Sequence, residues 1–187
     1  MSDNDSLRVV PGWTGRFYED FAVGDIYYHP MARTLTDADN QWFTLMTQNT
    51  SKTHLDANFA LQTEYGRPLM NSTLTLALVT GQSTIDLSFN VFANLGWDEV
   101  RCPVPVFAGD TIYSRSTVIS LRPSGSRPQI GIVTVATEGY NQDGVVVLGF
   151  RRAFMVYRRG EGPSTVGSRP DEASLLKLAG GGTASVA

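Results

Sequence analysis

The stretch "PLMNSTLTLALVTGQSTIDL", residues 68–87, predicts the helix around which the rest of the chain folds. Its polar residues Asn71, Ser72 and Thr73 gather at the N-terminal end, where a helix has free backbone N–H groups and a positive dipole end. Beyond them the segment leaves little polar face, and a helix that is apolar nearly all round is a buried one. Its apolar residues are Leu69, Leu74, Leu76, Ala77, Leu78 and Val79.

The segments that follow this helix predict antiparallel strands. They are rich in β-branched and aromatic residues and are separated by turn-forming stretches such as "RPSGSRP" (122–128) and "NQDG" (141–144). The Asp143-Gly144 pair marks a tight hairpin between the last two strands. The four predicted strands are "WDEVRC" (97–102), "DTIYSRSTVISL" (110–121), "QIGIVTVATEGY" (129–140) and "VVVLGFRRAFMVY" (145–157).

The segments before the helix predict one strand and two further helices. "DFAVGDIYYHPMARTLT" (20–36) reads as an early strand with a Gly24-Asp25 turn. In "LTDADNQWFTLMTQNT" (35–50), Thr36 and Asp39 have the spacing of a capping box. An apolar stripe follows in that helix, formed by Ala38, Trp42, Phe43, Leu45 and Met46.

A second short helix is predicted in "DANFALQTEYG" (56–66), with Asp56 as N-cap and Gly66 as stop. The order of elements predicts an α+β fold, with an antiparallel sheet curled around one buried helix. We expect a flexible N-terminus over 1–15 and one folded domain over 16–159. The Gly-, Ser- and Ala-rich segment 160–187 predicts a disordered tail with a short helical turn at "DEASLLKL" (171–178).

Composition excludes several classes of function. The formal net charge of −3 over 187 residues argues against nucleic acid as the main partner, because phosphate binding needs a basic face. No apolar run reaches the length of a membrane span, and the first residues have no signal-peptide pattern, so a cytoplasmic protein is expected. The single cysteine, Cys102, excludes an intrachain disulfide and a Cys-His metal cluster, and we expect it to be buried and inert.

Five segments, in order, resemble the MaoC-like acyl-CoA hydratases and dehydratases, which have the hotdog fold. They are "FYEDFAVGD" (17–25), "RTLTDAD" (33–39), "THLDANFA" (53–60), "GRPLMNSTLTLALVTG" (66–81) and "PVFAGDTIY" (105–113). Within the family the chain is most similar to the mesaconyl-CoA hydratase type, through "YGRPLMNSTLTLALVTG" (65–81), "NLGWDEVR" (94–101) and "GYNQDGVVV" (139–147). Hydratases of that type usually contain two hotdog units in one chain, and this chain has one.

The resemblance implies a catalytic motif in "TQNTSKTHLDANFA" (47–60). The family motif is Gly-Asp-x-Asn-Pro-(Ile/Leu)-His-x-Asp, and His54 matches its histidine. Asn49 stands where the family has its catalytic aspartate. Histidine suits the proton transfers of hydration because its pKa lies near neutral pH, whereas an amide does not titrate. His54 would therefore be the acid/base, and Asn49 would either position water or cap a helix end. Asp56 is more simply a helix cap.

The resemblance also implies where the thioester oxygen binds. In the family, backbone N–H groups at the start of the core helix form the oxyanion hole, and the matching positions are Ser72 and Thr73, with Asn71 before them. Capping of the helix by Asn71 or Ser72 is compatible with that role.

The sequence indicates less clearly which charged residues would bind the rest of the substrate. Arg67 and Arg101 could bind a substrate carboxylate, but structural salt bridges explain them equally well. Arg127 could contact CoA phosphates, but a solvated arginine in a hairpin is the simpler explanation. His29 is assigned no chemistry.

The implied function is hydration of a short, branched or dicarboxylic 2-enoyl-CoA, or the reverse dehydration. No metal or redox cofactor is implied, and CoA enters as part of the substrate. A single hotdog unit usually pairs, so we expect at least a homodimer. Two alternatives remain: a hotdog thioesterase, which needs an acid on the core helix where only Asp86 is available, and an inactive CoA- or acyl-binding subunit, which Asn49 favours.

Overall fold

The computed structural model describes residue 10 and residues 12–163. The chain divides into two compact units, one of Gly15–Gly162 and one of Met1–Thr14 with Pro163–Ala187. All described helices and strands belong to Gly15–Gly162. The predicted flexible N-terminus and disordered tail lie largely outside the described residues, and the helical turn predicted at 171–178 lies entirely outside them. These three expectations stay predictions.

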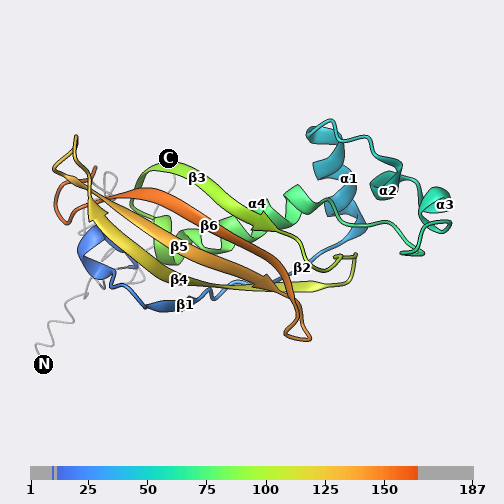
Figure 1. Ribbon diagram of the computed structural model, residues 1–187, viewed down its shortest axis with the longest axis horizontal. Coiled ribbons are helices and arrows are strands. Elements are labelled where there is room, and N and C mark those ends of the chain that lie inside the picture. Colours follow the sequence, from blue (N-terminus) through green and yellow to red (C-terminus); the bar gives the residue numbers. More distant parts are fainter. Residues whose placement is uncertain (1–9, 11, 164–187) are drawn as a thin grey trace, which may run out of the picture. The chain divides into compact units, whose positions relative to one another are not determined.

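An antiparallel sheet forms one layer of the Gly15–Gly162 unit (Figure 1). Its strand order is β1-β4-β5-β6-β3, and β2 pairs with β4 beside this path. β3 therefore forms one edge of the sheet. The predicted α+β architecture is confirmed. The strands are β1 (Ile26–Tyr28), β2 (Arg33–Thr34), β3 (Val91–Arg101), β4 (Thr111–Pro123), β5 (Ile130–Tyr140) and β6 (Val146–Tyr157).

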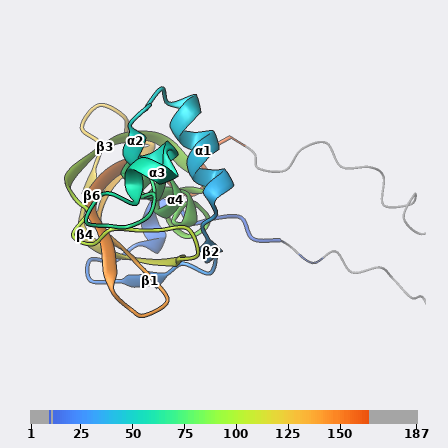
Figure 2. The same ribbon diagram turned by 90° about the vertical axis from the view of Figure 1, so that its right-hand side faces the viewer.

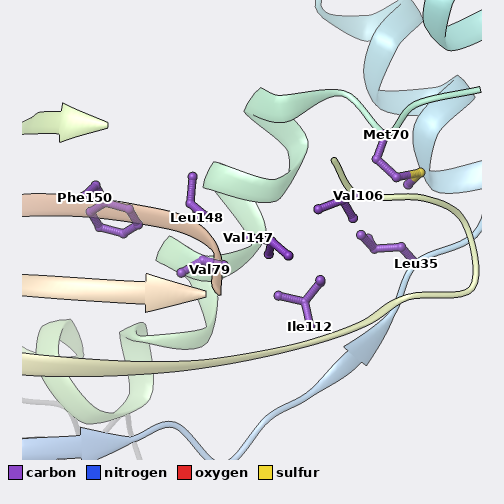
Figure 3. Close-up of a cluster of buried hydrophobic side chains, with 8 residues drawn as sticks. All are labelled: Leu35, Met70, Val79, Val106, Ile112, Val147, Leu148 and Phe150. Atoms are coloured by element: carbon purple, nitrogen blue, oxygen red, sulfur yellow. The ribbon is translucent and has the colours of Figure 1, made fainter. Parts of the chain in front are cut away.

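The helix predicted from residues 68–87 is α4 (Ser72–Gln82), and a π-helical segment, η2 (Thr84–Ser88), follows it. α4 lies along one face of the sheet. Val79 is fully buried on this face, and a Cβ added to Gly139 of β5 would lie 2.6 Å from Val79 Cγ2. Glycine at 139 therefore permits the close approach of α4 to the sheet. The surrounding cluster, shown in Figure 3, consists of Leu35, Met70, Val79, Val106, Ile112, Val147, Leu148 and Phe150.

The prediction that α4 is buried all round is wrong for this chain. Its buried residues, Thr75, Val79 and Gln82, lie on one face, whereas Ala77 and Gly81 are exposed. The sheet covers only one side of the helix. The other side of the helix borders a groove, which is lined by Ala77, Leu78, Gly81 and Ile85 together with Met31, Ala32 and Arg33.

α1 (Asp37–Met46) begins as predicted but faces the opposite way. The capping box is present, since Asp39 N–H donates to Thr36 Oγ1 at 3.3 Å and Thr36 N–H donates to Asp39 Oδ2 at 2.9 Å. The apolar stripe, however, is not in the core: Trp42 is 79%, Leu45 61% and Met46 72% exposed. The buried residues of α1 are Asn40 and Thr44, because this helix covers a group of polar atoms rather than the apolar core.

The second predicted helix, over 56–66, is shorter than expected and is preceded by another short helix. α2 (Lys52–Leu55), which was not predicted, is followed directly by α3 (Ala57–Ala60). Asp56 caps α3 as expected, accepting from Phe59 N–H at 2.9 Å. Beyond Ala60 the chain continues in turns, so Gly66, with φ of +66°, lies in a turn and does not end the helix.

Both predicted glycine turns are confirmed. Gly24 precedes β1 with φ of +95°, and Gly144 has φ of +75° in the loop between β5 and β6. In that loop the Asn141 side chain accepts from the N–H groups of Asp143 at 3.1 Å and Val145 at 3.0 Å. Left-handed backbone is readily adopted by glycine, which explains its place in each turn.

Candidate active site

A cavity of about 310 Å³ lies beside the start of α4. The helices α1, α2 and α3 gather near this end of the sheet, toward the viewer in Figure 2. His54 of α2 lines the cavity together with Ser72 and Thr75 of α4. Most of the remaining lining is apolar and includes Met70, Val104 and Val147. The cavity thus combines one titratable imidazole, the start of a helix and an apolar wall.

The hydrogen bonding of His54 determines which ring nitrogen is left free to accept a proton. Nδ1 lies 2.9 Å from the carbonyl oxygen of Leu69. A carbonyl oxygen only accepts, so Nδ1 must bear the proton and donate it. In the neutral ring, Nε2 then has a free lone pair. His54 is held as a base whose accepting nitrogen is Nε2.

Asn40 of α1 holds His54 and the start of α4 together. Its Nδ2 donates to the carbonyl oxygens of His54 at 3.1 Å and Leu69 at 2.9 Å. Its Oδ1 accepts from Asn71 N–H at 2.9 Å, and the residue is only 2% exposed. A buried amide with three such bonds fixes the backbone of both segments. Sequence reasoning missed Asn40, although the i, i+4 repeat of Asn40 and Thr44, opposite the apolar stripe, was a usable signal.

Two of the three N–H groups predicted for the oxyanion hole are already occupied. Asn71 N–H donates to Asn40, and Thr73 N–H donates to Asn71 Oδ1 at 3.0 Å, which makes Asn71 the N-cap of α4. Ser72 N–H makes no hydrogen bond to another described residue, and Ser72 lines the cavity. The available backbone donor at this helix end is therefore Ser72 N–H.

Comparison with known proteins identifies the family. The family described as mesaconyl-CoA hydratase matches residues 8–177 of this chain. A mesaconyl-CoA hydratase from Cereibacter sphaeroides is 34% identical over 145 residues, which are 78% of this chain and 42% of that protein. The chain belongs to the mesaconyl-CoA hydratase family. A β-methylmalyl-CoA dehydratase from Chloroflexus aurantiacus is also 34% identical, over 78% of this chain and 41% of its own length.

Solved structures of relatives confirm the hotdog fold of this mesaconyl-CoA hydratase family member. A protein from Chloroflexus aurantiacus described as a MaoC domain dehydratase is 32% identical, with a TM-score of 0.77, over 87% of this chain and 46% of that one. The MaoC-like dehydratase from Rhodospirillum rubrum is 28% identical, with a TM-score of 0.69, over 78% of this chain and 99% of that one. The chain spans less than half the length of the curated family relatives that it matches.

Asn49, at the position of the family's aspartate, is not among the residues that line the cavity. Its side-chain Oδ1 accepts from Ser51 N–H at 3.3 Å, and its N–H donates to the Thr44 carbonyl at 3.0 Å. These contacts lie within its own loop, just before α2. The structure therefore does not bring the amide of Asn49 into the cavity with His54.

The three candidate arginines do not line the cavity either. The Arg67 guanidinium lies 3.8 Å from the ring centroid of Phe107, and Arg101 donates to the adjacent Val100 carbonyl at 3.0 Å. Arg127 belongs to the β4–β5 hairpin, at the end of the sheet away from α1, α2 and α3 (Figure 1). The described cavity lining contains no lysine or arginine.

Cys102 is exposed and lines the cavity, so the prediction of a buried cysteine is wrong. It directly follows the last residue of β3, Arg101, and lies outside the regular sheet. Partial burial nevertheless raises the pKa of the thiol, which keeps it protonated at neutral pH. Within residues 12–163, no three His, Cys, Asp or Glu side chains are placed to hold a metal ion. None of the helices in this part of the chain is long and apolar enough to cross a membrane.

His29, to which sequence reasoning assigned no chemistry, is the centre of a separate buried cluster. Its Nδ1 lies 3.0 Å from Asp86 Oδ2, and its Nε2 lies 2.9 Å from Ser116 Oγ. Arg16 approaches the other oxygen of Asp86 at 3.3 Å, and Ser116 also bonds Thr137 at 2.8 Å. The His29 side chain and Ser116 are fully buried. No substrate can reach this serine, so the cluster joins η2 to the sheet and is not a hydrolase site.

This cluster makes stability depend on pH. Burial lowers the pKa of His29 below 6.5; Arg16 lowers it further, whereas the hydrogen bond and charge of Asp86 raise it. The unfolded chain then binds more protons than the folded one below pH 6.5. We expect the free energy of unfolding to be constant above that pH and to fall as the pH drops toward the lowered pKa. Urea unfolding between pH 5 and 8 measures how the free energy of unfolding changes with pH. If the same pH dependence is found in His29→Gln, His29 is not its source.

Proposed function

We propose that this chain hydrates a short 2-enoyl-CoA, or dehydrates the corresponding 3-hydroxyacyl-CoA. One observation supports the proposal above others: the unprotonated Nε2 of His54 and the unoccupied N–H of Ser72 belong to residues that line one cavity. Hydration needs these two groups, a base for water and a donor for the thioester oxygen. The names of the hydratase and dehydratase relatives favour the same reaction.

The reaction proceeds in two proton transfers. As the water oxygen bonds to C3, His54 Nε2 takes a proton from the water, and the electrons of the double bond move to the thioester oxygen. Ser72 N–H, at the positive end of α4, stabilises that enolate charge. A donor of this kind contributes on the order of 3 kcal/mol to the transition state. His54 then returns its proton to C2, which leaves the 3-hydroxyacyl thioester and the neutral imidazole.

The cavity favours a short acyl chain. Its volume of about 310 Å³ and its largely apolar wall suit a few carbons and one or two waters. A second carboxylate, as in mesaconyl-CoA, would need a cation that the lining lacks. We assign that role to Arg67 or Arg101; Arg101 directly precedes Cys102, which lines the cavity. Arg127, at the other end of the sheet (Figure 1), is not placed to contact the CoA phosphates of a substrate in this cavity.

A panel of acyl thioesters tests the proposal. The purified protein is incubated with crotonyl-CoA, mesaconyl-CoA and longer enoyl-CoAs, and loss of the double bond is followed beside release of free thiol. Loss of the double bond without thiol release is the expected result. Thiol release would show a thioesterase, and binding without turnover would show an inactive acyl-CoA-binding subunit.

The thioesterase alternative is weakened by the positions of its candidate groups. Asp86, the acid nearest to the core helix, bonds His29 and Arg16 and does not line the cavity. Cys102 does line it, but its raised pKa disfavours the thiolate that would attack a thioester.

A second copy of the chain, paired along the β3 edge, is the partner we propose. β3 is an edge strand of 11 residues, and it exposes Leu95 by 50% and Trp97 by 43%. Trp97 also donates to Thr80 of α4 at 3.3 Å, so this edge strand contacts the core helix. A long apolar edge is an aggregation hazard unless it is paired. The curated relatives, at more than twice the matched length, have room for a second such unit in one chain.

Leu95→Glu is expected to break this pairing. A charge on the edge strand would be desolvated in the dimer but remains hydrated in the monomer, so the mutant should sediment as one chain where the native protein sediments as two. Val145→Glu, at an exposed site in the β5–β6 loop, is the matched control and should leave the dimer intact. A native protein that sediments as a monomer at micromolar concentration would contradict the proposal.

A further inference from the structure

Thr75 is a buried threonine of α4 whose hydroxyl lacks a partner. The residue is only 3% exposed and lines the same cavity as His54. Its backbone N–H donates to the Asn71 carbonyl at 3.3 Å, as expected in a helix, but its hydroxyl makes no hydrogen bond to any described residue. Neighbouring buried polar side chains are all satisfied: Asn71 and Thr44 bond each other at 3.3 Å, and Asn40 makes three bonds.

The accessibility of this hydroxyl shows where it points. No fully covered side-chain oxygen or nitrogen among the described residues is left without a partner. Because the Thr75 hydroxyl has no partner, its oxygen must keep contact with open space, and the space that Thr75 lines is the cavity. A buried hydroxyl that faces a cavity of about 310 Å³ is satisfied by water, since leaving it dry would cost about 1–3 kcal/mol.

Hydration needs a second group to hold the water. The base removes a proton, but another hydrogen bond must fix the oxygen so that its lone pair points at C3. The family uses an aspartate here, and Asn49, which replaces it, bonds Ser51 in its own loop. The second group must therefore come from elsewhere in the cavity wall.

We infer that Thr75 is the residue that positions the reacting water, with its hydroxyl on one side and His54 Nε2 on the other. This inference rests on the proposed hydratase function. Thr75 lies three residues after Ser72, so it is about 4.5 Å further along α4. Four atoms in an extended chain span about 3.8 Å. When the thioester oxygen of the substrate bonds Ser72 N–H, atoms C3 and C4 of its acyl group therefore lie near Thr75.

The chemistry of a threonine limits this role to positioning. The hydroxyl is neutral, so it can donate or accept a hydrogen bond but takes no net proton from the water. The proton passes to His54 and then to C2, and Thr75 ends the cycle unchanged. The effect should fall on kcat rather than on KM, because the acyl-CoA itself does not depend on this contact.

Thr75→Val and Thr75→Ser test the inference as a pair. Valine has nearly the same shape without the hydroxyl, and we expect kcat to fall by about 10²-fold with every enoyl-CoA that the native protein hydrates, with KM unchanged. Serine restores the hydroxyl and should return kcat close to the native value. Calorimetric binding of butyryl-CoA, which has no double bond to hydrate, should be equal in all three proteins and shows that the cavity is intact.

The outcomes separate this inference from the function on which it rests. Native protein that hydrates no enoyl-CoA refutes the proposed function. If the native protein is active and Thr75→Val has native kcat, the function stands and the role of Thr75 is refuted. A loss confined to substrates with a polar acyl end, or an equal loss in the serine variant, would also overturn the water-positioning role.

Discussion

His54→Gln is expected to lower kcat for enoyl-CoA hydration by about 10²–10⁴-fold, the usual contribution of a general acid-base group. Glutamine can keep a polar contact near the Leu69 carbonyl, which now binds His54 Nδ1 at 2.9 Å. It cannot take a proton from water or return one to C2. The loss should therefore appear in kcat with little change in KM, measured as the rate of double-bond loss at saturating substrate.

Lys52→Gln provides the matched control for that result. It changes an exposed side chain in the same short helix, α2, and does not line the cavity. We expect native kcat in this variant. If His54→Gln also kept native kcat, His54 could not be the acid/base, and the proton path would have to use another group.

Asn40→Leu should have the largest effect on stability. Leucine has the same branching at Cγ but leaves the His54 carbonyl and the Asn71 N–H without their partners, now at 3.1 and 2.9 Å. Each buried polar group left unsatisfied costs about 1–3 kcal/mol, so the loss of both partners should lower the free energy of unfolding by about 2–6 kcal/mol. kcat should fall as well, since the same bonds place His54 relative to the start of α4.

Urea unfolding with the Asn58→Leu control measures this cost. Asn58 is exposed on α3, so the same change there should alter the free energy of unfolding by no more than about 0.5 kcal/mol. Equal unfolding midpoints for the two variants would show that the Asn40 bonds add no net stability. Normal stability with lowered kcat would assign Asn40 to the site alone.

The features that sequence predicted correctly are mainly local. The Thr36–Asp39 capping box, the Asp56 cap and the turns at Gly24 and Gly144 each depend on residues only a few positions apart. Short-range hydrogen bonds and left-handed backbone follow from residue type and spacing, so they can be predicted from one sequence. The last three strands were also recognised, because alternation and β-branched content persist over ten or more residues. β3, by contrast, begins at Val91 and not at the predicted Trp97, and the early strand predicted over 20–36 is two short strands, β1 and β2.

The predictions of which helix faces are buried were less accurate than the predictions of caps and turns. The far side of α4 was predicted to be buried, yet Ala77 is exposed, and the apolar stripe predicted in α1 leaves Trp42 79% exposed. Periodicity shows that a helix has an apolar face but does not show what covers it. A face that a second unit of the same fold would cover has the same pattern as one covered by the chain itself.

The candidate site likewise has some features that the sequence predicts and others that only the structure shows. Sequence alone determined the presence of His54, the helix beginning near Ser72 and the exchange of the family's aspartate for Asn49. Only the tertiary structure decided that Nε2 of His54 is its free nitrogen, that Asn71 N–H is occupied, and that Asn40 and Thr75 join the site. The physical reason is that a hydrogen-bond partner 15 to 31 residues away along the chain leaves no local trace in the sequence, whereas a cap or a turn does.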